Sequence, residues 1–309
     1  MRRPSVMRAA AWSIVGLGLA APAVRRRLRL KPPVVLGAAA SAPVALCVAL
    51  PRSRGRDVAV SALQMWAYVA AYELPNDDPQ RLRARVRMRY PVLADRVIGL
   101  GELPGLRLQR ALGRPGRPLR AAEQVLVWCH WLWFLVPHGA VAWLLVRRRE
   151  LFPSAAAIVY ATFDLGVVFY WIVPTAPPWY AAQIGALGDG AVVRRMMLEH
   201  GEAFWGGAWT RLYDVLAGNP LAAMPSLHFA TSVAAARQLA RAGRGPGALG
   251  WAYAATLGVA LVYLGEHYVI DLVAGFALTE AVRRAAPRVA PAAARASGAV
   301  QALERRAQA

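Results

Sequence analysis

The main pattern in the sequence is a series of long apolar segments separated by short arginine-rich stretches. A helix needs about 20 predominantly apolar residues to cross a bilayer, and several segments reach or approach that length. They lie at residues 11–24, 33–50, 58–72, 122–146, 154–173, 225–241, 248–264 and 268–283. Spanning strands would alternate apolar and polar residues, and the sequence has no such alternation. The pattern predicts an all-α, polytopic membrane helix bundle.

Composition shifts divide the chain into four parts. We expect N-terminal membrane spans at 1–74, a basic interfacial segment at 75–120 and a membrane core at 121–285. The Ala-rich tail at 286–309 is expected to be cytoplasmic and either disordered or lying on the membrane surface. Residues 1–24 combine a basic start with an apolar run, as a signal peptide does. The arginines that follow are a poor setting for cleavage, so the sequence favours an uncleaved first span.

The net charge is +20, and Lys31 is the only lysine. A strongly basic chain can bind nucleic acid, but these arginines flank apolar runs, as at 25–27, 147–149 and 283–284. That placement is typical of topology signals and of contacts with anionic headgroups. We therefore expect the membrane, and no nucleic acid, as a partner. The use of arginine in place of lysine indicates a GC-rich bacterial source and hence a bacterial cell membrane.

Two short strings carry the candidate chemistry: Met224-Pro225-Ser226-Leu227-His228 and His267-Tyr268-Val269-Ile270-Asp271. The chain has five histidines, and an ionisable side chain at the mouth of an apolar segment is costly enough to indicate function. On a helix, residues four apart share a face, so Asp271 can hold one nitrogen of His267 and leave the other free to attack. A purely structural His–Asp pair explains this string equally well.

The first string predicts a helix start. Proline and serine are preferred there, and the free amides of a first turn attract anions. His228 can protonate a leaving oxygen, although an ordinary capped helix is the simpler interpretation of this string alone. Together the strings supply a nucleophile, its orienting acid, a second acid/base and phosphate-binding donors. Arginine counts place both on the extracytoplasmic face. The combination points to phosphoryl transfer on a lipid.

These strings resemble the type 2 phosphatidic acid phosphatase superfamily, whose members carry P-S-G-H and a later H-x-x-x-D. Leu227, in place of glycine, is similar to the branch that contains the inositol phosphorylceramide synthases. The element Pro174-Thr175-Ala176-Pro177-Pro178-Trp179-Tyr180 also resembles that branch. The resemblance covers about residues 122–284, and the basic stretch before them more loosely.

The resemblance implies a metal-independent, cofactor-free enzyme with a six-helix core. It makes His267 the nucleophile, Asp271 its orienter and His228 the acid/base. The candidate substrate-binding residues are Ser226, Pro225, Trp179 and Tyr180; interfacial anchoring explains the last two nearly as well.

The sequence departs from the superfamily pattern at two places. The phosphatases have Ser-Arg six to seven residues before the second histidine, where this chain has Ala260 and Leu261. The usual K-x6-R-P element is also not found. Phosphate-binding cations must come from elsewhere, and the candidates are Arg194, Arg195, Arg211 and the arginines of 81–96. The departure favours a lipid-headgroup transferase over a standard phosphatase.

The sequence therefore predicts a lipid phosphotransferase that moves a headgroup such as inositol phosphate from a phospholipid donor to a lipid-alcohol acceptor. One alternative is a phosphatase of lipid or polyprenyl (di)phosphates with the same site. A second alternative is a membrane scaffold or transporter whose histidines line a path.

Other polar residues within the apolar regions have simpler interpretations. His130 and His138 lie among tryptophans and fit an aromatic belt better than a metal site. Asp164 lies in the middle of a span, where it either partners an arginine of the site or bonds to a neighbouring helix. Asp77 and Asp78 fit a helix start better than a metal site. Cys47 and Cys129 are expected to be packed thiols.

Overall fold

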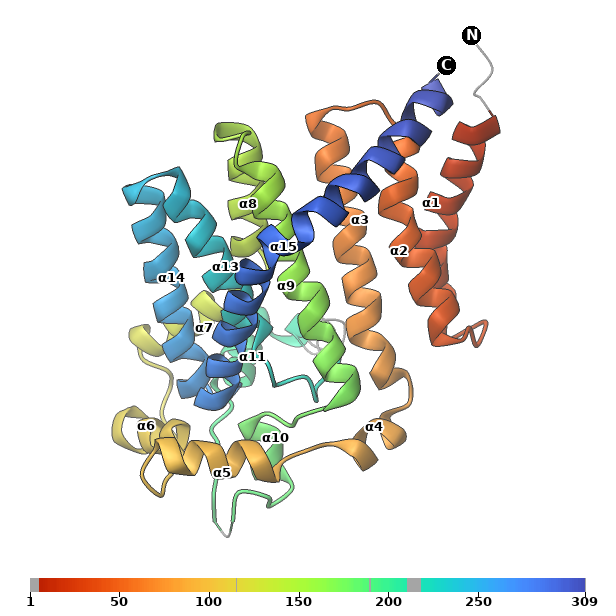
Figure 1. Cartoon of the computed structure of the whole chain (residues 1–309). Coiled ribbons are helices and arrows are strands. Elements are labelled where there is room, and N and C mark those ends of the chain that lie inside the picture. Colours follow the sequence, from red (N-terminus) through yellow and green to blue (C-terminus); the bar gives the residue numbers. More distant parts are fainter. Residues whose placement is uncertain (1–5, 115, 189, 210–217, 309) are drawn as a thin grey trace. The chain divides into compact units, whose positions relative to one another are not determined.

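The computed structural model describes residues 6–114, 116–188, 190–209 and 218–308, and most of these are helical (Figure 1). They contain no strand; the only β-type pairings among them are two isolated parallel bridges, which join Thr175 to Arg87 and to Ala222. The prediction of an all-α membrane bundle is confirmed.

The chain forms two compact units, Met1–Asp77 with Val282–Ala309 and Asp78–Ala281. The first unit contains α1 (Val6–Val24), α2 (Pro32–Ala49), α3 (Arg54–Glu73), the 3-10 turn η1 (Leu74–Asp77) and the C-terminal part of α15 (Val269–Gln308). Helix α2 packs against both α1 and α3.

A buried ion pair ties the C-terminal part of α15 into the first unit. Arg56 Nη1 contacts Glu304 Oε1 at 2.8 Å, and both side chains are nearly buried. The same nitrogen donates to the backbone oxygens of Cys47 and Leu50. In this unit Asp77 forms ion pairs with Arg25 and Arg26.

The structure differs from the prediction for the tail, because residues 286–308 are helical rather than disordered. Alanine has the highest helix propensity of all residues, and its repetition here continues the helix through Pro287 and Pro291. Ala307 is buried in a cluster with residues of α1, α2 and α3, so the end of the helix is also held by packing.

The second unit contains the remaining helices. They are α4 (Pro79–Arg85), α5 (Arg89–Ile98), α6 (Pro104–Leu112), α7 (Ala121–Leu132), α8 (Val136–Arg147), α9 (Phe152–Ile172), α10 (Pro178–Gln183), α11 (Met196–Trp205), α13 (Leu227–Ala242), α14 (Arg244–Tyr263) and the first part of α15. Helix α13 packs against α14, α9 and α8, while α14 packs against α7 and α6. Figure 1 shows α5 running across the direction of α9 and α14 of the same unit.

Helix starts follow the local sequence signals. Asp78 caps α4 by accepting a hydrogen bond from the Arg81 amide at 3.0 Å, which is the helix-start role expected for it. Proline occupies the first turn of α2, α4, α6, α8, α9 and α10, where its missing N–H leaves no hydrogen bond unmade.

Among the described residues, four helices are long and apolar enough to cross a membrane: α1, α2, α9 and α14. The predicted span 122–146 is instead two helices, α7 and α8, bent by 58° at a short break. Pro137 in the first turn of α8 cannot donate to a preceding turn, which favours a break there. Counted as one span, the pair makes a fifth candidate. The chain is an integral membrane protein.

The contact between α9 and α13 depends on Gly166 and Leu227. A Cβ atom added at Gly166 would lie 2.2 Å from Cδ2 of Leu227, and Leu227 is 2% exposed. The leucine that follows Ser226 therefore fills a space left by the absent side chain of Gly166.

We expect Gly166→Ala to destabilise the fold by about 1–3 kcal/mol, because overpacking forces side chains off their rotamers. Leu227→Ala creates a cavity and costs about 2–5 kcal/mol alone. The double variant should lose less free energy of unfolding than the two single variants lose together, since the new methyl group enters the space that the leucine leaves. Thermal unfolding in detergent measures all three.

Gly139→Ala is the matched control, since it lies in α8 with no atom within 4 Å of the added Cβ. It should not destabilise the protein. Additive costs in the Gly166–Leu227 cycle would contradict the packing argument.

Candidate active site

The two histidine-bearing strings meet where α13 and α15 begin. The Ser226 amide donates to the Asp271 carbonyl at 3.0 Å, and the Thr279 hydroxyl donates to the Ala230 carbonyl at 2.8 Å. A Cβ at Gly275 would lie 2.6 Å from the Ser226 carbonyl oxygen. Glycine at this position therefore allows the two helices to approach closely enough for their first turns to share one site.

His228, His267 and Asp271 form a continuous chain of contacts. Nδ1 of His228 lies 3.2 Å from Nε2 of His267, and Nδ1 of His267 lies 3.3 Å from Oδ2 of Asp271. Asp271 is fully buried and His267 is 4% exposed. With both rings neutral, Asp271 accepts from Nδ1–H of His267, so Nε2 of His267 is the acceptor for Nδ1–H of His228. This tautomer leaves a lone pair on Nε2 of His267.

The ring of His228 is enclosed by two side chains from the region around the α7–α8 break. The centroid of the Trp133 ring system lies 4.1 Å away and that of His130 lies 4.7 Å away. Trp133 is itself held by Nε1, which donates to the Thr231 hydroxyl at 2.9 Å. His130 is 7% exposed. It therefore packs against His228 inside the protein and does not belong to an aromatic belt at the membrane interface. Their i, i+3 spacing is the sequence signal that could have grouped His130 with Trp133.

Asp95, on α5, caps the helix that carries Asp271. Its two carboxylate oxygens accept from the amides of Val269 and Ile270, each at 2.9 Å, and the residue is 1% exposed. Burial raises the pKa of the Asp95 carboxyl, while the two amide donors act in the opposite direction. Sequence reasoning missed this residue, because no local pattern links α5 to a helix start so far along the chain.

The two isolated bridges at Thr175 join three distant segments beside the site. Thr175 pairs with Arg87 on one side and with Ala222 on the other. The hydroxyl of Tyr90 lies 2.6 Å from that of Thr175 and donates to Sδ of Met224 at 3.3 Å. The basic segment and the proline-rich element are thereby held against the residues that lead into Pro225.

The candidate substrate-binding residues have different surroundings. The Trp179 amide donates to the Gly265 carbonyl at 3.1 Å, and the Trp179 side chain donates to Glu266, which places Trp179 against the loop before His267. Tyr180 instead packs against a buried cluster of Leu82, Ala176 and Leu221.

Pro225 and Ser226 form the buried start of α13. The Pro225 carbonyl accepts from the Tyr170 hydroxyl at 2.8 Å. The Ser226 hydroxyl accepts from the Phe229 amide at 3.4 Å and is therefore the helix cap. The Leu227 and His228 amides of this first turn have no hydrogen-bond acceptor among the described residues, so they remain available to an anion.

The candidate phosphate-binding arginines have different interaction partners. Arg194 contacts Glu199 at 2.7 Å and donates to the carbonyls of Arg114 and Arg117. The guanidinium of Arg195 lies 3.9 Å from the centroid of the Trp179 ring system. Burial raises the pKa of the nearby Glu266 carboxyl, while the positive charge of Arg195 acts to lower it. Arg211 lies outside the described residues.

Two of the arginines within 81–96 bind backbone carbonyls: Arg85 donates to Trp171 and Arg96 to Leu187. Ala260 and Leu261, which occupy the positions of the phosphatases' Ser-Arg, are fully buried in α14. No group of three or more His, Cys, Asp or Glu side chains in the described part of the chain is arranged to hold a metal ion. Asp164 is partly buried within α9.

A family model described as the PAP2 superfamily matches residues 117–283, which include both histidine strings. Searches of curated proteins and of solved structures returned no match.

We expect Asp95→Ala to loosen the start of α15, because two buried amides lose their acceptor at about 1–3 kcal/mol each. Backbone hydrogen exchange should become faster in the peptide that covers residues 267–273. Asp78→Ala removes a cap of similar strength from α4 and is the matched control; it should leave that peptide unchanged. Equal exchange in both variants would contradict the role of Asp95.

Proposed function

The chain belongs to the PAP2 superfamily, and on that premise we propose that it moves a phosphoester headgroup from a phospholipid to a lipid alcohol through a phosphohistidine at His267. Superfamily membership makes the chain a lipid enzyme of the phosphatase or phosphotransferase type. The observation that carries the finer proposal is the chain of contacts from His228 through His267 to Asp271.

In the first half-reaction Nε2 of His267 attacks the phosphorus of the donor. A nitrogen–phosphorus bond forms as the bond from phosphorus to the oxygen of the departing lipid alcohol breaks. Asp271 stabilises the positive charge that develops on the ring of His267. His228 enters this step protonated on both ring nitrogens, and its Nδ1 proton passes to the departing oxygen, which leaves a neutral ring. In the resting protein that proton faces the attacking nitrogen, so the phosphoryl group must enter between the two rings.

In the second half-reaction the acceptor's hydroxyl gives its proton to Nδ1 of His228. Its oxygen forms the new bond to phosphorus, and the nitrogen–phosphorus bond to His267 breaks. Both residues return to their starting states, and the headgroup has moved from one lipid to another. The free amides of Leu227 and His228 support this scheme, because a helix start stabilises the charge on the transferring group.

Burial limits the access of bulk water to His267. His267 is 4% exposed, and the void beside it has a volume of about 10 Å³, close to the least that holds one water molecule. A closed site limits hydrolysis of a reactive intermediate.

The donor is proposed from two features of the chain. Leu227 and the element that ends in Trp179 and Tyr180 are similar to the inositol phosphorylceramide synthase branch, so we propose a headgroup such as inositol phosphate. Because arginine-rich linkers face the cytoplasm in membrane proteins, we propose that the site lies on the extracytoplasmic side of a bacterial membrane.

The first test follows phosphatidylinositol labelled in its headgroup, with mixed lipid alcohols as acceptors and a chelator present. Label should appear in a new lipid, and His267→Gln should abolish the reaction. His228→Gln should slow it by about 10²–10⁴-fold, the usual contribution of an acid/base residue. Lipid mass spectrometry gives the products, and acid-labile label on the protein reports the intermediate.

Each contrary outcome rejects a different part of the proposal. Label released mainly into water would indicate a phosphatase instead. Unchanged turnover in His267→Gln would reject both enzymatic interpretations and favour a scaffold or transporter. Loss of activity with chelator would contradict metal-independent chemistry.

Trp179→Ala is expected to raise the fraction of label released into water, since it removes the side chain that covers the loop before His267. The measured quantity is the ratio of free to lipid-bound label. Trp12→Ala is the control, because Trp12 is an exposed tryptophan of α1 in the first unit. A ratio that is the same in both variants would contradict the covering role of Trp179.

A further inference from the structure

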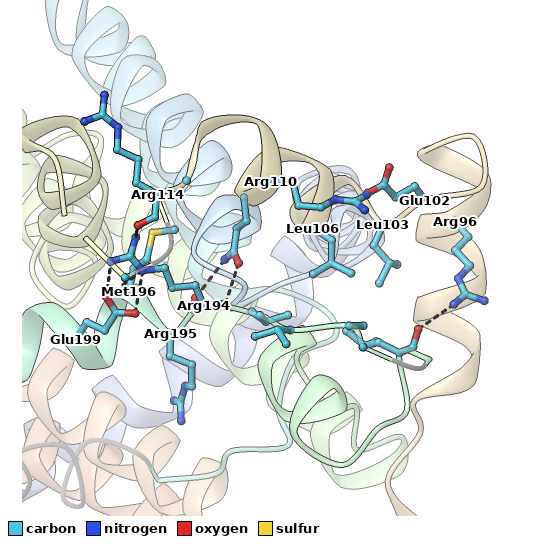
Figure 2. Close-up of a pocket in the computed structure, with 18 of the residues that line it drawn as sticks. Arg96, Glu102, Leu103, Leu106, Arg110, Arg114, Arg194, Arg195, Met196 and Glu199 are labelled. Carbon is cyan, nitrogen blue, oxygen red and sulfur yellow. Dashed lines mark hydrogen bonds and ion pairs between the residues drawn. The ribbon is translucent and has the colours of Figure 1, made fainter. Parts of the chain in front are cut away.

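A cavity of about 810 Å³ lies next to the site but does not contain its histidines. It is bounded by α5, α6 and the turns that follow them on one side, and by residues 187, 190–196 and 199 on the other (Figure 2). Sites for small organic ligands have volumes of roughly 300–1,000 Å³. The cavity is therefore large enough for a lipid headgroup, unlike the void beside His267.

The charges that line the cavity favour an anion. Five arginines and two glutamates contribute to its wall. Glu102 is paired with Arg107 and Arg110, and Glu199 is paired with Arg194. The carboxylates are thus already matched by arginines, and positive charge remains.

Three arginines remain: Arg195 lies over the Trp179 ring and near Glu266, and Arg96 and Arg114 carry the rest of the charge. Arg96 uses one guanidinium N–H to donate to the Leu187 carbonyl at 3.0 Å, which leaves most of its five donors unused. No carboxylate of the described residues lies within ion-pair distance of Arg96 or Arg114. Figure 2 shows the two arginines in different parts of the cavity wall. Arginine is well suited to bind phosphate, because its planar group donates two parallel hydrogen bonds.

A mainly apolar part of the wall separates the cavity from the nucleophile. Leu103, Leu106, Gln109 and Val193 line both the cavity and the small void beside His267. Gln109 fixes this wall: its amide donates to the Tyr263 carbonyl at 2.7 Å, and its oxygen accepts from the Arg194 amide at 2.9 Å. A ligand in the cavity would thus rest on the side chains whose other faces border His267.

We propose that this cavity binds the anionic phosphoester headgroup of a lipid, with Arg96 at one end and Arg114 at the other supplying the positive charge that attracts it. The inference rests on the proposed function for the identity of the ligand. Aliphatic side chains in the wall suit the first carbons of the lipid, and the arginines suit its phosphate. Free inorganic phosphate shares the charge but gains nothing from the apolar wall.

Binding is measured by calorimetry on the full chain carrying His267→Asn, in detergent, so that no lipid is consumed. The probe is short-chain phosphatidylinositol, with short-chain phosphatidylcholine and inorganic phosphate as comparisons. The combined variant Arg96→Gln with Arg114→Gln should weaken binding of phosphatidylinositol at least tenfold. The control, Arg147→Gln with Arg148→Gln, removes the same charge at the exposed end of α8 and should change the affinity less than twofold.

Equal affinity in the two double variants would overturn the proposal. So would inorganic phosphate that binds as tightly as the anionic lipid, which would indicate a site for the free ion, or phosphatidylcholine that binds as tightly, which would remove the preference for negative charge. Lipid binding needs no turnover: retained binding in a protein that fails to transfer label would reject the proposed function and leave this site in place.

Discussion

The buried carboxylate of Asp271 is the constraint on which the rest of the site depends. A charge without partners is costly inside a protein and more so in a membrane protein. Here Oδ2 of Asp271 lies 3.3 Å from Nδ1 of His267 and accepts from the Tyr268 amide at 2.9 Å, and the residue's own carbonyl accepts from the Ser226 amide. One residue thus orients the nucleophile through Oδ2 and ties the second helix to the first, while its Oδ1 has no partner among the described residues. Much of the surrounding packing serves to keep these contacts in place.

That support comes from parts of the second unit far apart in sequence. Asp95 of α5 holds the first amides of α15, Trp133 near the α7–α8 break holds the ring of His228, and Gly275 lets α13 approach α15. None of these residues stands in the two motifs. The basic segment, which composition alone describes as a surface lying against headgroups, also provides a cap for the active-site helix. Its arginines then border a cavity whose far wall reaches the nucleophile.

The parts of the site that local patterns predict are those set by spacing along one helix or by one helix start. The i, i+4 relation of His267 to Asp271 and the cap at Ser226 are of this kind, and the structure has both contacts. The predictions from sequence were wrong where two local preferences compete. An apolar run predicted one straight span across 122–146, but Pro137 and the packing around the break bend it. An Ala-rich tail was interpreted by its composition as disordered, whereas its helix propensity and the burial of Ala307 make it helical.

The sequence by itself determined the all-α membrane architecture and the pair of strings that carries two histidines and one aspartate, because apolar length and helical periodicity are local properties. Only the tertiary structure decided that Nδ1 of His228 faces Nε2 of His267, that His130 lies against His228 instead of in an aromatic belt, and that Asp95 caps α15. These contacts join segments up to 175 residues apart. Such pairings are chosen by how helices pack and by the need of buried polar groups for partners, and neither leaves a signal in a single stretch of chain.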